Sequence, residues 1–435
     1  MRYKWTLTTL LISIVIVSGT FTYFWIVPPP AIPRICLLYT EEIVVENRGD
    51  KPVNFGGIST EGFLNLSWQR AILVSVNGKY TFSRDGDGNP YIKAEGPEIL
   101  RPGESYSVKI VWRIESFDRS MPDIDRKDAE GYESLPSSLE NYTRIVAPWW
   151  SPPNIRLDTQ GWVGTVYYNM SIEEVASFLA KNKTSILEIV LEDVKWIATY
   201  VHYYSASPTY PVETARNMTG DCDDQANLLI ALLRLQKIPA FLMMGLIYLQ
   251  SERYANRTGF SLGGHQYNEY HHVAGHGWAM VYIPPWGWLP CDLTSTLPSV
   301  LRRYPEKAIT NAFFWSPVTI TFRNVTGIGG SKSSDYIGSI RRAKAEAEKK
   351  NIYYKLILDL RQVSLSVFEL IRRSPMFVIY SEIICVLAAI LVIWAHERRE
   401  KAPPYLQNVI CPYCGSENPG DAVYCGWCGR KITRE

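Results

Sequence analysis

Cys222 is the residue whose surroundings most favour chemistry. The segment Gly220–Asp224 leads into an Ala- and Leu-rich stretch that Pro239 stops, which predicts a loop and then a helix of about four turns with Cys222 in its first turn. A thiol at a helix N-terminus sits in the positive end of the helix dipole, which favours thiolate and lowers its pKa. The flanking acidic residues oppose that effect. A nearby base is therefore needed to complete activation.

A histidine and an aspartate farther along the chain suit that role. The sequence predicts a strand from His276 to Ile283, a tight turn at Pro284–Gly287 and a second strand ending at Asp292. Residues on the two arms of one hairpin can face each other. An aspartate there would hold the imidazole tautomer, and the imidazole would deprotonate the thiol. We therefore predict a catalytic triad of Cys222, His276 and Asp292.

The two motifs together resemble the transglutaminase core. They are Gly220-Asp221-Cys222-Asp223 with Lys237-Ile238-Pro239-Ala240, and His276-Gly277-Trp278 with Val281-Tyr282-Ile283-Pro284, Gly287-Trp288 and Asp292-Leu293-Thr294. Leu293 replaces the family's usual proline. The resemblance covers roughly residues 140–300. It implies a papain-like fold in which Cys222 forms an acyl-thioester with an amide substrate, His276 protonates the leaving amine and Asp292 orients His276.

The resemblance also implies how the acyl group is handled. The group would pass to an amine (transamidation) or to water (peptide hydrolysis or deamidation). The oxyanion hole would include the Cys222 backbone N–H. An upstream tyrosine would supply a second donor, with Tyr203, Tyr204 and Tyr210 all open candidates.

Four residues near these motifs have weaker claims to chemistry. His271 and His272 are candidate rival bases or metal ligands, but a surface or cleft-lining role is favoured. Cys291 is expected to be a buried strand residue. A disulfide between Cys291 and Cys36 remains an open alternative in an oxidising compartment.

The tail carries a second pattern. Cys411 and Cys414 form one CxxC pair and Cys425 and Cys428 form another. Two such pairs grip a tetrahedral Zn²⁺ from both sides, so the tail resembles a small zinc ribbon with a structural metal and no open coordination position. Two redox dithiols are the less favoured alternative. A cytoplasmic protein contact is the expected purpose.

Charge offers little support for nucleic-acid binding. The chain has 45 basic and 43 acidic residues, so it carries no strong electrostatic field. The tail's basic patch is small, comprising Arg430, Lys431 and Arg434. A membrane-tethered nucleic-acid regulator is therefore the third and weakest hypothesis.

Two apolar segments divide the chain. Residues 5–27 and 376–395 are each long enough to cross ~30 Å of hydrocarbon, and Glu382 is the one charge within them. A cleaved signal peptide is the alternative for the first segment, and a buried core helix for the second. We predict an uncleaved anchor and a second transmembrane helix.

The flanking charges and glycosylation signals predict the topology. Basic residues flank both outer ends, which places both termini in the cytoplasm, although Arg372 and Arg373 weaken this inference. Seven Asn-x-Ser/Thr sequons lie between the spans, at Asn65, Asn141, Asn169, Asn182, Asn217, Asn256 and Asn324. The region between the spans is therefore expected outside the membrane, where it would meet its peptide or protein substrate.

The segments between the motifs predict the architecture. Short β-branched runs over residues 35–117 indicate β structure. The turn at Asp85–Pro90 lacks the glycine and glutamate of a calcium loop, so a hairpin turn is favoured. Helical signals begin at Ser171, continue over Ile186–Tyr203 and return over residues 335–372.

We therefore expect an α+β protein with a papain-like transglutaminase core. The predicted order is an N-terminal transmembrane anchor (1–30), a β-sandwich-like domain (31–120), a linker (121–140), the catalytic domain (141–330), a helical stalk (331–374), a transmembrane helix (375–396) and a cytoplasmic tail with the zinc ribbon (397–435). The expected function is that of a membrane-anchored cysteine acyltransferase or peptidase. Its main rival is a non-catalytic receptor or scaffold that binds peptide outside and signals through the ribbon.

Overall fold

The computed structural model describes residues 31–146, 156–158, 168–205, 207–328, 335–366 and 408–432, with isolated positions between 369 and 394. Residues 33–364 form one compact unit, and the tail belongs to a second. The expected first span, residues 5–27, lies outside the described residues, and the second, 376–395, is described only at isolated positions. Within the described part of the chain, no helix is both long enough and apolar enough to cross a membrane.

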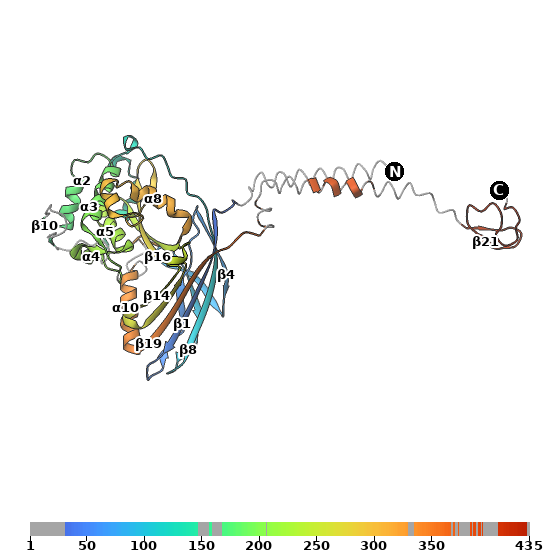
Figure 1. Cartoon of the computed structure of the whole chain (residues 1–435), viewed down its shortest axis with the longest axis horizontal. Helices are drawn as coiled ribbons and strands as arrows, with labels where there is room; N and C mark the ends of the chain where they lie inside the picture. Colours follow the sequence, from blue (N-terminus) through green and yellow to red (C-terminus); the bar gives the residue numbers. More distant parts are fainter. Residues whose placement is uncertain are drawn as a thin grey trace. The chain divides into compact units, whose positions relative to one another are not determined.

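The largest sheet of the 33–364 unit has six strands. Their spatial order is β14 (Asn256–Ser261), β15 (Gln266–His271), β19 (Ile352–Gln362), β1 (Ile35–Asn47), β8 (Ser105–Ser116) and β4 (Gln69–Val76). The long strands β1, β8 and β19 run side by side in Figure 1. β15 and β19 are parallel, and the other neighbours are antiparallel.

A smaller set of strands shares a hydrophobic core with this sheet. It comprises a three-stranded sheet of β3 (Gly57–Glu61), β6 (Pro90–Glu95) and β5 (Tyr80–Arg84), and the short pair β2 (Val53–Asn54) with β7 (Ile99–Leu100). Ile92 of the smaller sheet and Ile110 of the larger one are fully buried in the same cluster. That cluster also contains Leu246, Val273 and Ile320, which come from the catalytic segment.

The structure therefore differs from the predicted division into a β domain over residues 31–120 and a catalytic domain over 141–330. The six-stranded sheet takes β1, β4 and β8 from the first range and β14 and β15 from the second. One sheet and one apolar core cross the expected boundary. The reason is that the edge of β1 that does not pair with β8 pairs with β19, which lies much later in the chain.

The predicted helical stalk over residues 331–374 is also corrected. A helix, α10 (Tyr336–Lys350), does occur, but Asn351 ends it in a left-handed conformation with φ of 50°. The chain then forms β19, which pairs along β1 from Leu37↔Gln362 to Asn47↔Ile352. Residues 352–362 are therefore an interior strand of the main sheet.

A four-stranded antiparallel sheet and a group of helices make the rest of the unit. The strand order is β17 (Gly287–Cys291), β16 (Val273–Ile283), β13 (Ala240–Tyr248) and β18 (Thr319–Val325). The helices are α2 (Ile172–Ala180), α3 (Ile186–Tyr200), α4 (Pro211–Asn217), α5 (Cys222–Leu235), α6 (Glu252–Ala255), α7 (Pro298–Arg303) and α8 (Lys307–Trp315). The short pairs β9 (Arg156–Asp158) with β10 (Tyr168–Ser171), and β11 (His202–Tyr203) with β12 (Thr219–Gly220), complete it.

Several local predictions in this region are confirmed. Ser171 and Glu174 form the expected capping box at the start of α2. The helix expected over Ile186–Tyr203 is α3, which ends at Tyr200. The expected hairpin is β16 and β17, which pair from Ile283↔Gly287 to Ala279↔Cys291.

The predicted linker over residues 121–140 is a surface strap of short 3₁₀ turns. These are η1 (Arg126–Asp128), η2 (Tyr132–Ser134) and the beginning of η3 (Ser137–Thr143); two further turns occur elsewhere, η4 (Leu262–Gly264) and η5 (Ser316–Val318). The backbone of Glu130 accepts a hydrogen bond from Ile186 N–H and donates one to the carbonyl of Pro284. The strap is thereby tied to α3 and to the β16–β17 turn.

Helix α5 is the central helix of the unit and is held at both ends. The fully buried Arg234 guanidinium donates to the carbonyl oxygens of Ala240, Thr326 and Arg144 at 2.6–2.9 Å near the C-terminal end. At the N-terminal end, Gly277 of β16 packs against Asp223: a Cβ built on Gly277 would lie 2.7 Å from the Asp223 Cβ and 3.0 Å from its Cα. The absence of a side chain at Gly277 allows the first turn of α5 to touch the strand.

This contact predicts the effects of two glycine substitutions on one strand. Gly277→Ala should lower the unfolding free energy by about 1–3 kcal/mol through overpacking and should slow alkylation of Cys222, because helix and strand must separate. Gly275→Ala is the control, since a Cβ there meets nothing within 4 Å, and its effect should stay within about 0.5 kcal/mol. Urea unfolding and the rate of Cys222 modification measure both effects. Equal behaviour of the two variants would contradict this account of the contact.

Candidate active site

The first turn of α5 presents Cys222. The helix begins at this residue, as predicted, and Asp221 is its N-cap. The Asp224 carboxylate accepts the backbone N–H groups of Asp221 at 3.2 Å and Thr209 at 2.7 Å. A side chain at Gly220 would collide with Asp224, at 2.5 Å between Cβ atoms. These contacts determine where the thiol lies before any partner is considered.

Strand β16 presents the histidine. His276 and Trp278 are two residues apart and share one face of the strand. Their rings stack with centroids 5.7 Å apart and an interplanar angle of 24°. Trp278 is itself buried against Met243 and Met280. The indole therefore fixes one face of the imidazole.

Asp292 lies one residue beyond the last paired residue of β17 and reaches back to His276. Its Oδ2 atom lies 2.7 Å from His276 Nε2. Its Oδ1 atom accepts hydrogen bonds from Thr294 N–H at 2.9 Å and from the Thr294 hydroxyl at 3.0 Å. The sequence suggested that His276 and Asp292 face each other directly across the hairpin. They are not a directly opposed pair, but their side chains still meet.

The thiol of Cys222 lies in the electrostatic environment of this pair. The His276 ring lowers the pKa of the Cys222 thiol, and Cys222 in turn raises the pKa of His276. The Cys222 Sγ atom also lies 4.0 Å from Asp223 Oδ1. The structure thus brings all three residues of the predicted triad together.

The electrostatics of the pair favour a charged imidazole. Burial alone lowers the pKa of His276, but the Asp292 carboxylate and, after it, Cys222 raise that pKa well above its usual value. Burial raises the pKa of Asp292, yet His276 and the Thr294 donors bring it below its ordinary value. Asp292 therefore remains ionised and holds a proton on the ring.

The pKa of the thiol differs from expectation. Burial raises the pKa of Cys222 above its ordinary value; the His276 hydrogen bond and charge lower it, and Asp223 and Asp221 raise it. The predicted lowering by the helix N-terminus is thus outweighed by desolvation and by neighbouring carboxylates. Thiolate at this position depends on the His276 imidazolium.

The acidic residues beside Cys222 share this desolvated environment. Burial, followed by contact with Asp223, raises the pKa of Asp221 to about 8. Burial and Asp223 likewise raise the pKa of Asp224 to about 6. The hydroxyl of Tyr336, from α10, donates a hydrogen bond to Asp223 Oδ2. The cluster therefore carries less negative charge at neutral pH than its three carboxyl groups suggest.

The structure separates the three candidate tyrosines. Tyr210 donates its hydroxyl to Asp335 Oδ1 at 2.9 Å, so it is already engaged. Tyr203 of β11 pairs directly with Gly220 of β12. Burial raises the pKa of Tyr203, and the charges of Cys222 and Asp221 raise it further. Tyr203 is consequently the candidate tyrosine that shares the electrostatic environment of the thiol.

The remaining candidates lie outside this constellation. His271 contacts Asn256 Oδ1 at 2.8 Å, and His272 contacts the Leu249 carbonyl at 2.9 Å. Neither belongs to a metal-ligand cluster among the described residues. Cys291 is buried and its thiol is free, so the alternative of a disulfide between Cys36 and Cys291 is not supported.

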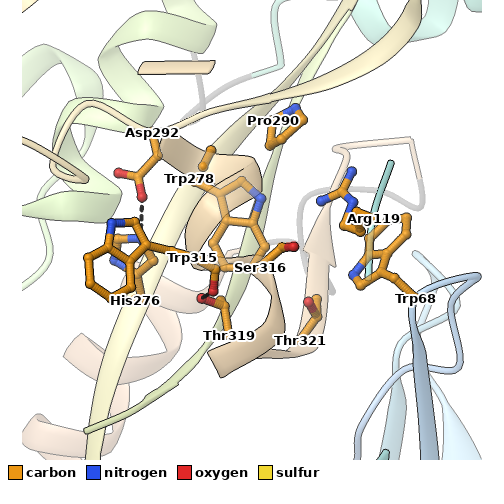
Figure 2. A pocket seen from close by; sticks show the side chains of 11 residues that line it. Trp68, Arg119, His276, Trp278, Pro290, Asp292, Trp315, Ser316, Thr319 and Thr321 are labelled. Atoms are coloured by element: carbon orange, nitrogen blue, oxygen red, sulfur yellow. Dashed lines mark hydrogen bonds and ion pairs between the residues drawn. The ribbon is translucent and has the colours of Figure 1, made fainter. Parts of the chain in front are cut away.

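Sequence reasoning missed a cavity beside the His276–Asp292 pair, shown in Figure 2. It combines residues from β16 and the β17 end with Trp68, Arg119 and a group from α8, η5 and β18. Trp68 and Arg119 lie in segments that were assigned to the β domain. Only the sheet that crosses the expected boundary brings them here, so no local motif indicated them.

The tail cysteines form a compact cluster. All four Sγ atoms lie within 4.8 Å of one another. Two Sγ–Sγ distances, Cys411–Cys428 at 3.7 Å and Cys414–Cys425 at 3.6 Å, are close to the ~3.8 Å edge of a tetrahedron with Zn–S bonds of ~2.3 Å. Gly415 and Gly429 have positive φ of 75° and 70°, as the two tight turns require. The donor set and its spacing fit zinc.

The contact between His276 and the thiol predicts how Cys222 should titrate. The alkylation rate should rise with pH through a raised thiol pKa, because the reactive thiolate appears only as the thiol loses its proton. His276→Ala should slow alkylation at pH 7.5 by tenfold or more, since a charge-assisted hydrogen bond is worth ~1.5–3 kcal/mol. His271→Ala is the matched control and should leave the rate unchanged. Iodoacetamide kinetics with peptide mass spectrometry measure both, and an unchanged rate in His276→Ala would refute the pairing.

Comparison with known proteins adds a family match. Residues 173–293 match the family model of the transglutaminase-like superfamily. A proposed cysteine protease from Cytophaga hutchinsonii is 13% identical, with 76% of this chain and 92% of that chain covered and a TM-score of 0.42. The periplasmic domain of TgpA from Pseudomonas aeruginosa is 12% identical, with 64% and 91% covered and a TM-score of 0.30. No curated protein matches the chain. The resemblance of the two motifs is confirmed: residues 173–293 of this chain form a transglutaminase-like core.

Proposed function

We propose that the 33–364 unit is a cysteine acyl-transfer enzyme that acts on peptide or protein amides. The observation that carries this proposal is the meeting of three groups: Asp292 lies 2.7 Å from the His276 ring, and that ring lowers the pKa of the Cys222 thiol. It lies between a helix N-terminus and a strand that are locked together at Gly277. Nucleophile, base and orienting carboxylate are the three roles that this chemistry needs.

The acylation step follows from the geometry. In the reactive form of the pair, Cys222 and His276 share one proton; this proton moves to the His276 ring, and the Cys222 sulfur attacks the amide carbonyl to form a tetrahedral intermediate. The S–C bond then remains as the thioester, the C–N bond breaks, and His276 returns its proton to the leaving amine. Asp292 keeps the imidazolium oriented and charged between these two transfers. The thioester is resolved when water or a second amine attacks it.

Stabilisation of the intermediate falls to groups at the start of α5. The backbone N–H of Cys222 lies in the first turn, where helix N–H groups have no intrahelical acceptor and can face an oxyanion. Tyr203 is the tyrosine best placed to be a second donor, since the charge at Cys222 raises the pKa of its hydroxyl.

Trapping of the acyl-enzyme tests this function. The full-length chain incubated with denatured casein and a biotinylated primary amine should form a Cys222-linked thioester. Biotin-labelled casein would indicate transamidation, and new casein N-termini would indicate hydrolysis. Cys222→Ala should abolish both products, whereas Cys291→Ala should retain them. If no thioester forms while peptide still binds, the non-catalytic receptor becomes the better hypothesis.

We further propose that the chain is a two-pass membrane protein whose 33–364 unit is exported. The support is the pair of apolar segments and the sequons between them. The side chains of five of the sequon asparagines are exposed, as glycosylation requires: Asn65, Asn141, Asn182, Asn217 and Asn256. The tail would then lie in the cytoplasm, where thiols stay reduced.

In the tail, Cys411, Cys414, Cys425 and Cys428 would hold a structural Zn²⁺ and present a surface to a cytoplasmic protein. One experiment tests both the metal and the topology. In sealed cells, a membrane-impermeant mercurial should release no zinc from the protein. After the membrane is opened, the same reagent should release one zinc ion per chain. Cys414→Ser should lose the metal, whereas Cys36→Ser should keep it. Zinc release before opening would refute the topology, and a metal-free protein would refute the ribbon.

A further inference from the structure

A small cavity lies beside His276. It has a volume of about 20 Å³, larger than the ~10–15 Å³ that one water molecule needs. Trp68, Trp278 and Trp315 contribute to its walls (Figure 2). The cavity therefore holds a group only slightly larger than one water molecule.

Arg119 supplies a positive charge at one end of this cavity. The centre of its guanidinium lies 3.8 Å from the Trp68 ring centroid and 5.0 Å from that of Phe313. Burial lowers the pKa of Arg119 to about 10, which leaves it charged at neutral pH. Stacking occupies the guanidinium faces and leaves its N–H edges available, the geometry that binds a carboxylate with two parallel hydrogen bonds.

Two buried hydroxyl groups line the same cavity without partners. The side-chain oxygens of Ser316 and Thr321 have no hydrogen-bond partner, although these residues are only 6% and 0% exposed. Among the described residues, no acidic side chain forms an ion pair with Arg119 either. A buried hydroxyl without a partner is costly, so a polar group in the cavity, either water or part of a ligand, would stabilise both hydroxyl groups.

The sheet places this cavity next to the general acid. His276 pairs with Gly245 on β13, and Gly245 pairs with Thr321 on β18, so the three residues form one row across the sheet. Directly paired residues point to the same face. Gly245 has no side chain to fill the row between His276 and Thr321, and a Cβ there would lie 2.1 Å from the Ile320 carbonyl oxygen and 3.2 Å from the Trp278 ring.

The lining also indicates which part of a substrate would enter. His276 and Asp292 line the cavity, but Cys222 does not. In the proposed function His276 gives a proton to the leaving amine, so the cavity lies on the amine side of the cleaved bond. The Asp292 carboxylate would repel an anion, but His276 and Thr294 already bind both of its oxygens.

We propose that this cavity is a subsite for a carboxylate, bound by Arg119 with Ser316 and Thr321, on the amine side of the scissile amide. This inference rests on the proposed function and narrows its substrate class to amides whose amine half carries a carboxylate. A chain-terminal carboxylate and an acidic side chain share this chemistry, and the test separates them.

Alkylating probes test the subsite without requiring turnover. N-bromoacetyl-glycine and its neutral amide differ only in the carboxylate, and the Cys222 thiolate displaces bromide from either one to form an S–CH₂ bond. N-bromoacetyl-aspartic acid α-amide and the matching asparagine derivative move the carboxylate to a side chain. Peptide mass spectrometry of the full-length chain gives the rate at Cys222 alone. In the favoured pair, we expect the acid to react about tenfold faster than the neutral probe.

Three variants decide whether this preference comes from the cavity. Arg119→Met keeps the apolar stem and should reduce the ratio of acid to neutral rates to about one. Thr321→Val should lower the ratio about threefold without lowering the unfolding midpoint. Arg126→Met is the control, because Arg126 is exposed and pairs with Glu306 at 3.6 Å, and it should keep the wild-type ratio.

The outcomes distinguish this inference from the function on which it rests. A ratio that Arg119→Met leaves unchanged, while iodoacetamide still modifies Cys222, would refute the subsite alone. If Thr321→Val only raises the unfolding midpoint and keeps the ratio, its hydroxyl is a structural feature and the subsite is again refuted. A Cys222 that reacts with no probe would refute the acyl-transfer function, and the subsite with it.

Discussion

Contact between the first turn of α5 and strand β16 is the constraint on which the rest of the site depends. At Gly277 the strand backbone comes within van der Waals distance of Asp223, and a single methyl group would separate them. Cys222 and His276 are the chain neighbours of these two residues, so the packing of backbone against backbone sets the distance between thiol and ring. The Tyr336–Asp223 hydrogen bond adds α10 to the same junction. Geometry at the site is thus a property of the packed unit rather than of flexible side chains.

Desolvation has opposite consequences on the two sides of this junction. Around Asp292 it is offset by three hydrogen bonds, so a carboxylate stays ionised and strengthens its neighbour's charge. Around Cys222, desolvation raises the pKa of the thiol and the adjacent carboxyl groups raise it further. Asp221 itself holds a proton near neutral pH. The thiol therefore relies on a single positive partner. A site arranged in this way couples reactivity tightly to His276 and leaves an isolated Cys222 inert.

Local signals in the sequence were sufficient for the site and insufficient for the sheet. Three features were predicted: the start of α5 at Cys222, the capping box at Ser171 and the β16–β17 hairpin. Each follows from turn residues, helix caps or the periodicity of apolar residues within about twenty positions. β19 pairs with β1 across some three hundred residues, and no local pattern carries such pairing. The pKa of Cys222 was misjudged for the same reason. A helix dipole can be inferred from the sequence, whereas burial by distant elements cannot.

The pairing of β1 with β19 has a topological consequence. Leu37 lies opposite Gln362, so the chain enters the 33–364 unit and leaves it at adjacent points on neighbouring strands. The unit therefore resembles an inserted domain, because its first and last residues lie close together. Its two ends could be joined by a short peptide and new termini opened elsewhere without breaking the sheet. Different flanking segments can therefore be joined to this unit without rearranging its strands.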